Sequence, residues 1–233
     1  EEANLIAANL TNVNLSNARL ARLKGQDAVF KRANLRGADL TEANLNGAFL
    51  YGAILESVTA PRAIFLSCNL RWARFDKAKL TGAIFESAIG GPTYFKNAIL
   101  NKSNFRRSLI VDSIFLDGAN LEGANFDEAL LEGGFFTGAN LRGASFKKAI
   151  ISESGFEESN LINVDFSESD LRASDFDDAD ITGAILAHAN LEDTAFEGAK
   201  LIKADLSHAT GIEPGMFDDA IMTGAILTRS AHP

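Results

Sequence analysis

The sequence has little of what enzymes, secreted domains and membrane proteins usually contain. Its 233 residues include one cysteine, Cys68, so an internal disulfide is excluded and a cysteine-based zinc cluster lacks ligands. Only three histidines are available for acid–base or metal chemistry. No apolar run approaches the roughly 18 residues of a transmembrane helix. We therefore expect neither a disulfide scaffold nor membrane insertion.

Catalytic motifs are also missing. There is no glycine-rich phosphate loop, no Ser/His/Asp set and no metal-spaced Cys/His cluster. No signal-peptide pattern opens the chain, which starts in the middle of a repeat at Glu1-Glu2-Ala3-Asn4-Leu5. The net charge of −9 disfavours a surface that binds nucleic acid. The sequence predicts no enzyme, no cofactor and no direct contact with nucleic acid.

The feature present in abundance is a repeat of five residues. Large apolar centres recur from Leu5 to Phe115, from Leu121 to Gly211 and from Phe217 to Leu227, and each shift absorbs one inserted residue. The residue two before the centre is small, usually alanine. A period of five fits neither a helix nor a strand. It predicts a chain that turns a corner in every unit, with four units closing a coil of about 20 residues.

The phenylalanines support this coil. Fifteen of the 17 occupy centres, and all of these except Phe30 recur at 20 or 21 residues in two series. We expect two columns of rings spaced by about 4.8 Å, with Phe156 stacked between Phe136 and Phe176. We also expect the polar residues before the centres to form hydrogen-bonded ladders between coils, at Asn120, Asn140, Asn160 and Asp180.

Units such as Ala33-Asn34-Leu35, Ala38-Asp39-Leu40 and Ala43-Asn44-Leu45 resemble the A-(D/N)-L-x-x motif of the pentapeptide repeat proteins, and the resemblance covers essentially the whole chain. It implies an all-β fold, a right-handed quadrilateral β-helix of about 11 coils of 20 residues. The family implies no enzyme activity. Its members include DNA mimics that act on type II topoisomerases, a cyanobacterial differentiation regulator and thylakoid-lumen proteins, so function stays open.

We predict a single domain over residues 1–233 with a few irregular positions. A bulge is expected at 116–118, and an irregular turn or short helix at 211–216. The large centre is replaced at four positions, which mark candidate loops or kinks: Gly25, Ala60, Gly90 and Gly211.

Charge is divided unevenly along the expected rod. Residues 1–107 carry 15 basic and 8 acidic residues, a net charge of +7. Residues 108–233 carry 7 basic and 23 acidic residues, a net charge of −16. One side of the acidic half has no lysine or arginine, which predicts either a solvated face or a docking site for a basic partner. Its candidate interaction residues are Asp117, Glu157, Glu158, Asp175, Asp177, Asp178 and Glu197.

The neighbouring side of the rod carries outward apolar and aromatic residues, with Lys31, Arg32 and Arg71 beside them. Such a stripe either suits strands or forms a protein interface. We favour the interface, with candidate residues Phe49, Tyr51, Trp72, Ile89 and Leu109. A weaker pattern places Glu168, His188 and His208 on successive coils about 5 Å apart, either as a solvated ladder or as metal ligands.

Three functions follow from these observations. The favoured one is a non-enzymatic protein-interaction scaffold whose partner is a basic protein or a second copy of the chain. The alternative is an acidic DNA mimic that modulates a type II topoisomerase such as DNA gyrase, against which stands the basic first half. The third is an enzyme or metal protein. A bacterial or cyanobacterial cytoplasm, a periplasm and a thylakoid lumen all fit as compartments.

Overall fold

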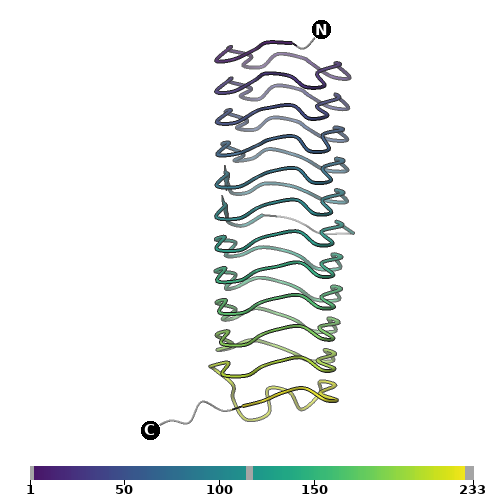
Figure 1. Ribbon diagram of the computed structural model, residues 1–233, viewed down its shortest axis with the longest axis vertical. Helices are drawn as coiled ribbons and strands as arrows, with labels where there is room; N and C mark the ends of the chain where they lie inside the picture. Colours follow the sequence, from purple (N-terminus) through teal and green to yellow (C-terminus); the bar gives the residue numbers. More distant parts are fainter. Residues whose placement is uncertain (1–2, 114–117, 229–233) are drawn as a thin grey trace.

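The computed structural model describes residues 3–113 and 118–228. These residues wind into a rod in which the coils follow one another in sequence order (Figure 1). Neighbouring coils pair in parallel through bridges between residues 20 apart, as in Asn4↔Lys24. The spacing becomes 21 at Ile99↔Asn120 and again at Lys200↔Ile221, once for each inserted residue. The architecture is a repeat β-helix.

Each coil contributes four bridge positions, and these define four faces of the rod. We call the two turn residues after each face the corner of the same number. Continuous strands are short: among the described residues only β1 (Ile89–Gly90) and β2 (Leu109–Ile110) form, and they pair in parallel. Elsewhere the pairing is a single bridge, because a turn interrupts the chain in every unit. The bridge residues run from Asn4 to Ile226 on face 1, from Asn9 to Thr210 on face 2, from Asn14 to Ala195 on face 3 and from Arg19 to Ile221 on face 4.

The same backbone hydrogen bonds recur in each unit. The N–H of Leu5 donates to the carbonyl of Lys24 at 2.7 Å, and the N–H of Ala8 donates to Leu5 at 3.0 Å and closes the turn. The second turn residue has positive φ, for example 62° at Trp72. That conformation costs a non-glycine residue about 1–2 kcal/mol. The cost is offset because the same residue's N–H bonds the next coil, as Trp72 does to the carbonyl of Pro92 at 2.6 Å.

The polar residues at the bridge positions act mainly within their own coil, which corrects the expected ladders. The side-chain oxygens of Asn120, Asn140, Asn160 and Asp180 each accept from the backbone N–H two residues later, at 3.1–3.3 Å. Of the bonds expected between these four side chains, the structure shows the one from Asn140 Nδ2 to Asn120 Oδ1, at 3.2 Å. The preference is local because the turn leaves an amide N–H within reach of a short side chain.

The core is a filled axis of leucine and phenylalanine between small corner residues. Phe156 is fully buried and stacks on Phe136 and Phe176, with both centroid distances 4.8 Å and interplanar angles of 2° and 4°. This confirms the predicted column. The two columns also meet edge to face along the axis, as Phe146 and Phe156 do at 6.2 Å and 89°. Stacked and perpendicular pairs are both favoured arrangements of aromatic rings.

We predict that Phe156→Ala lowers the free energy of unfolding by about 3–5 kcal/mol, since it removes buried apolar area and leaves a cavity between two rings. Equilibrium denaturation measures the loss. Phe135→Ala is the matched control, because Phe135 is 48% exposed and should change stability far less. Equal losses in the two variants would contradict the assignment of the core.

Three of the four irregular centres keep the coil intact. Bridges continue at the residues just before Gly25, Ala60 and Gly90. At Gly25 the sizes are exchanged: the small position carries Leu23, which is fully buried, and a Cβ on Gly25 would lie 2.9 Å from Leu45 Cδ2 and 3.4 Å from Leu23 Cδ2. Leu23 therefore fills the volume that a centre residue usually occupies.

The end of the rod is different. The face 2 ladder stops at Thr210, and residues 214–219 form turns rather than a helix. Residues 116 and 117 of the expected bulge lie outside the described residues, although pairing resumes with Ile99↔Asn120.

The exchange at Leu23 and Gly25 predicts strong coupling between two substitutions. Leu23→Ala should destabilise by about 2–5 kcal/mol through a cavity, and Gly25→Leu by about 1–3 kcal/mol through overpacking. The double variant restores the ordinary pattern and should lose less than the sum of the two. A double-mutant cycle by chemical denaturation checks this, and additive losses would contradict it.

Candidate functional site

The interior of the rod offers no substrate site, because leucine, phenylalanine and alanine side chains fill it along the described length. Cys68 is buried there, and its Sγ donates to the carbonyl of Leu45 at 2.9 Å. Burial raises the pKa of the Cys68 thiol to about 12, so the reactive thiolate is not formed at neutral pH. Functional chemistry must therefore be sought on the surface.

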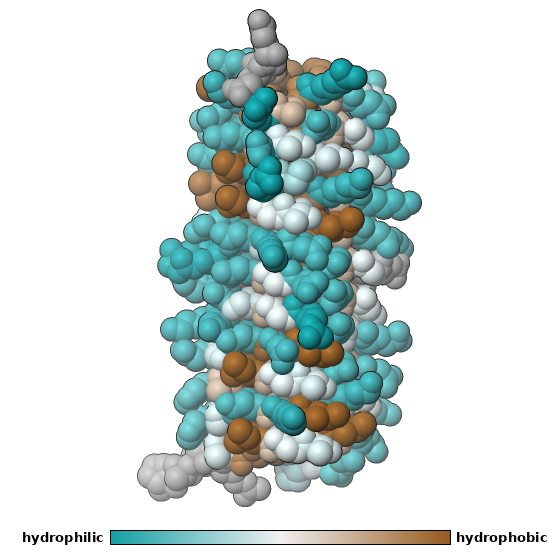
Figure 2. All heavy atoms as spheres, turned by 45° about the vertical axis from the view of Figure 1, so that its right-hand side comes forward, coloured by the Kyte–Doolittle hydropathy of each residue, from teal (hydrophilic) through white to brown (hydrophobic). Residues whose placement is uncertain are grey.

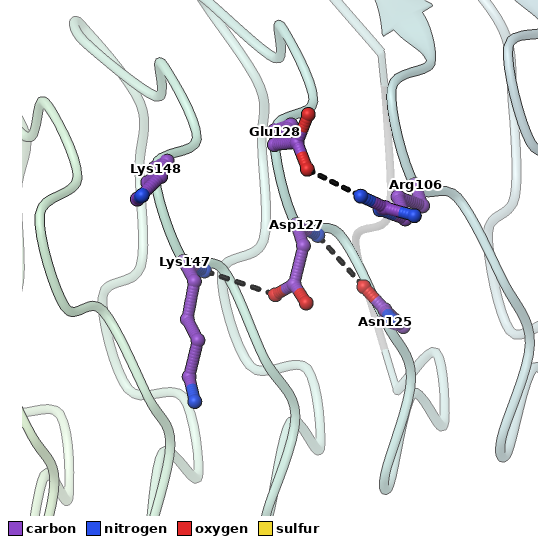
Figure 3. A pocket seen from close by; sticks show the side chains of 6 residues that line it. All are labelled: Arg106, Asn125, Asp127, Glu128, Lys147 and Lys148. Atoms are coloured by element: carbon purple, nitrogen blue, oxygen red, sulfur yellow. Dashed lines mark hydrogen bonds and ion pairs between the residues drawn. The ribbon is translucent and has the colours of Figure 1, made fainter.

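A surface hollow lies on corner 1 between successive coils (Figure 3). Its volume is about 350 Å³, and its walls alternate in charge. The backbone N–H of Lys147 donates to Asp127 Oδ1 at 3.1 Å, and the Lys147 ammonium lies 3.0 Å from Asp165. Arg106, Lys147 and Lys148 each form an ion pair with a carboxylate, whereas Asp127 is held by hydrogen bonds from the Ser145 hydroxyl and the Lys147 N–H. Its lining residues are Arg106, Asn125, Asp127, Glu128, Lys147 and Lys148.

The strongest electrostatic contact of corner 1 is at Glu128. Its carboxylate accepts from Arg107 Nε at 2.8 Å and forms an ion pair with Arg106 at 2.5 Å. These hydrogen bonds, from Arg107 first and then from Arg106, lower the pKa of Glu128 to about 2. Corner 1 continues with Lys148 and Glu168, 3.4 Å apart. The sequence analysis missed this ladder, although equivalent repeat positions alternate in sign.

The lowered pKa predicts a specific dependence of stability on pH. Since the folded pKa of Glu128 lies below its ordinary value near 4.5, its contribution is complete above about pH 5 and declines as pH falls toward 2. The stability difference between the wild type and Glu128→Gln should follow that curve in denaturant titrations. Salt should reduce the difference, because the group is exposed. A difference that stays constant between pH 5 and pH 3 would contradict the assignment.

The predicted acidic residues gather at the far end of the rod, on corner 3 and the adjoining face 3. We call this group the acidic corner. Within the described residues its members form no ion pair. Asp117, the remaining acidic candidate, lies outside the described residues. The acidic corner comprises Glu157, Glu158, Asp175, Asp177, Asp178 and Glu197, together with Asp218 and Asp219 in the turns that follow the last face 3 bridge.

Backbone and hydroxyl donors position these carboxylates. Asp177 Oδ1 accepts from the N–H of Glu197 at 2.7 Å, and Asp175 Oδ1 accepts from the N–H of Asp177 at 2.9 Å. The Glu157 carboxylate accepts from the Thr137 hydroxyl at 2.7 Å. These three carboxylates are thus each held at a fixed rung of the coil ladder. The acidic corner can attract a cationic surface.

The apolar candidates occupy face 2 and corner 2. Bridge residues on face 2 form an apolar stripe of Val29, Phe49, Ile89, Leu109, Leu130 and Ile150. Corner 2 carries Tyr51 and Trp72, exposed by 36% and 48%. The Lys31 ammonium lies 5.8 Å from the centroid of the Tyr51 ring, a cation–π distance. On the side of the rod that Figure 2 shows, separate apolar patches lie among hydrophilic side chains.

The structure brings together two of the three candidate metal ligands. The rings of His188 and His208 stack at 4.9 Å with an angle of 15°. Glu168 instead turns toward Lys148. Across residues 3–113 and 118–228, no group of three or more His, Cys, Asp or Glu side chains is placed to hold a metal ion. In that same part of the chain, no helix is long and apolar enough to cross a membrane.

This coil geometry defines a class of protein, the parallel β-solenoids with a five-residue unit. The family model described as "Pentapeptide repeats (8 copies)" matches residues 1–24, 26–58, 62–89 and 189–230, and the model described as "Pentapeptide repeat region" matches 134–206. The chain belongs to the pentapeptide repeat family. No curated protein matches it.

Solved structures of the family are similar to the chain. HetL, a pentapeptide repeat protein involved in heterocyst differentiation regulation in Nostoc sp. strain PCC 7120, is 26% identical over 97% of this chain and 90% of its own, with a TM-score of 0.47. QnrB1, a plasmid-mediated fluoroquinolone resistance protein, is 17% identical over 82% of this chain and 93% of its own, with a TM-score of 0.33. A pentapeptide repeat protein from the thylakoid lumen of Arabidopsis thaliana is 27% identical over 41% of this chain and 63% of its own, with a TM-score of 0.26.

Proposed function

We propose that the chain is a non-enzymatic protein-interaction scaffold that binds a basic partner through its acidic corner. The proposal includes a right-handed rod of about 11 coils as the scaffold. The observation that carries it is a row of carboxylates that form no ion pair within the described residues, on a ladder whose core is filled by buried leucine, phenylalanine and alanine side chains. Fixed charges of one sign raise the association rate of an oppositely charged partner and orient it.

The charge density of the acidic corner suits an extended cationic surface. Its eight carboxylates lie on four successive coils, which span about 19 Å at about 4.8 Å per coil. That is about one charge per 2.4 Å, against about one per 1.7 Å along double-stranded DNA. The match supports the second candidate function, an acidic DNA mimic acting on DNA gyrase. Against it, 19 Å corresponds to fewer than about six base pairs, and the first half of the chain is basic.

We predict that a decalysine peptide binds the wild type, and that Asp175→Asn, Asp177→Asn and Asp178→Asn together weaken binding at least about tenfold. Asparagine keeps the side-chain oxygen that accepts from the backbone, so the coil should remain folded. Fluorescence anisotropy at low and physiological salt measures the affinity.

The matched control is Glu122→Gln, Glu192→Gln and Asp193→Asn, which removes the same charge from exposed positions elsewhere. Equal weakening in both triple variants would show that net charge alone drives binding and would overturn the acidic corner as a site. A gyrase supercoiling assay separates the two candidate functions, because inhibition that the acidic-corner triple variant loses would favour the DNA mimic.

A further inference from the structure

Face 2 carries an uninterrupted series of seven bridge rungs whose centre is Ile89. The seven rungs run from Val29 to Ile150, and six of them are apolar, the exception being Asn69. The next rung after Ile150 is the charged residue Asp170. Four members are exposed: Phe49 by 51%, Ile150 by 45%, Ile89 by 40% and Leu109 by 37%. Continuous strands β1 and β2 lie at its middle. A contiguous apolar stripe on a regular sheet face is a typical site of association.

We propose that two copies of the chain pair antiparallel through face 2, with the two-fold axis at Ile89. This symmetry places rungs at equal distances from Ile89 opposite each other, since a two-fold interface is self-complementary. Val29 then lies opposite Ile150 of the second copy, and Phe49 lies opposite Leu130. The whole apolar stripe is covered, and this inference goes beyond the proposed function.

The corners that flank face 2 are complementary in the same register. Asp27 on corner 1 lies opposite Lys148 of the second copy. The two residues belong to the Val29 and Ile150 rungs, each three rungs from the Ile89 rung. Within the described residues Asp27 forms no ion pair, and Lys148 has only its exposed contact with Glu168. On corner 2, Lys31 lies level with Glu153 and Arg71 lies level with Asp112 of the second copy. Each pair occurs twice because the interface is symmetric.

The orientation follows from the charge of the two halves. With the axis at Ile89, an antiparallel pair sets residues 1–89, with 11 basic and 8 acidic residues and net +3, against residues 90–182, with 8 basic and 16 acidic residues and net −8. A parallel pair would set each half against itself, with Asp170 opposite Asp170. The potential of the whole chain therefore favours the antiparallel arrangement.

The area of face 2 is sufficient for a stable dimer. With the axis at Ile89, the rungs from Asn9 to Asp170 face a rung of the second copy. They have eight spacings, or about 38 Å at about 4.8 Å each, and five residues set a side of at most about 16 Å. The product is about 600 Å² per copy and about 1,200 Å² in total, at the lower end of the usual range of specific interfaces.

One residue opposes the pairing. Glu86 shares the Ile89 coil, so the two copies bring their Glu86 carboxylates to the same level near the axis. Its carboxylate accepts from Asn104 Nδ2 at 3.2 Å, and the contact holds it at corner 1. Like charges facing each other weaken association. Glu86→Gln should therefore tighten the dimer.

Cross-linking of single-cysteine variants tests the register. With sheets about 10 Å apart, the two copies of Ile89→Cys face each other, whereas the two copies of Phe49→Cys are about 22 Å apart. A short bismaleimide should link Ile89→Cys into dimers and leave Phe49→Cys unlinked. A mixture of Phe49→Cys and Leu130→Cys should also link. The native Cys68 is buried and does not compete.

Sedimentation equilibrium of the full chain tests the interface itself. Asp27→Lys should weaken the dimer about tenfold, and the reversal Asp27→Lys with Lys148→Asp should restore it. A monomer at 100 µM would overturn the proposal. Cross-linking of Phe49→Cys would also overturn it, because that result indicates a parallel pair. A dimer whose affinity changes with neither Asp27→Lys nor Glu86→Gln would overturn it as well. None of these results bears on decalysine binding, because the acidic corner lies away from face 2. A confirmed dimer would expose two acidic corners and bind its partner bivalently.

Discussion

The structure depends on the parallel backbone pairing between coils 20 or 21 residues apart. Each unit gives its bridge and turn N–H groups to neighbouring coils, so every coil is held by the coils before and after it. This pairing satisfies the backbone of residues with positive φ and places phenylalanines one coil apart at stacking distance. It also aligns surface side chains in rows. Core, turns and surface charge therefore share one spacing.

A shared spacing concentrates function on the rows. The alternating row on corner 1 cancels its own charge through contacts such as Arg107 to Glu128, whereas the acidic corner has no internal counterpart. The axis is filled with apolar side chains along the described residues, and Cys68 is buried among them. The function that we propose, recognition through repeated surface features, uses the outward rows. Antiparallel pairing through face 2 would combine two such recognition rows in one assembly.

Much of this was predictable from the five-residue period. The Phe156 stack and the outward acidic and apolar rows follow from position within the unit, because each unit meets the same environment. Other features were not predictable. Gly25 indicated an irregular coil, yet Leu23 fills the gap from a position that is usually small. Asn160 suggested a bond between coils, but a nearer turn N–H takes its oxygen. Of the three weak candidate metal ligands, Glu168 forms an ion pair with Lys148, a neighbour that the sequence analysis did not consider.

By itself the sequence determined the family, the inward and outward positions and the division of charge between the two halves. These properties are local, since a residue's place in its unit decides whether it faces the axis or solvent. Only the tertiary structure decided which charges neutralise one another and which remain unpaired. That outcome depends on neighbours 20 or 21 residues away, on where the inserted residues shift the register, and on competition between local turns and the next coil for the same polar atoms.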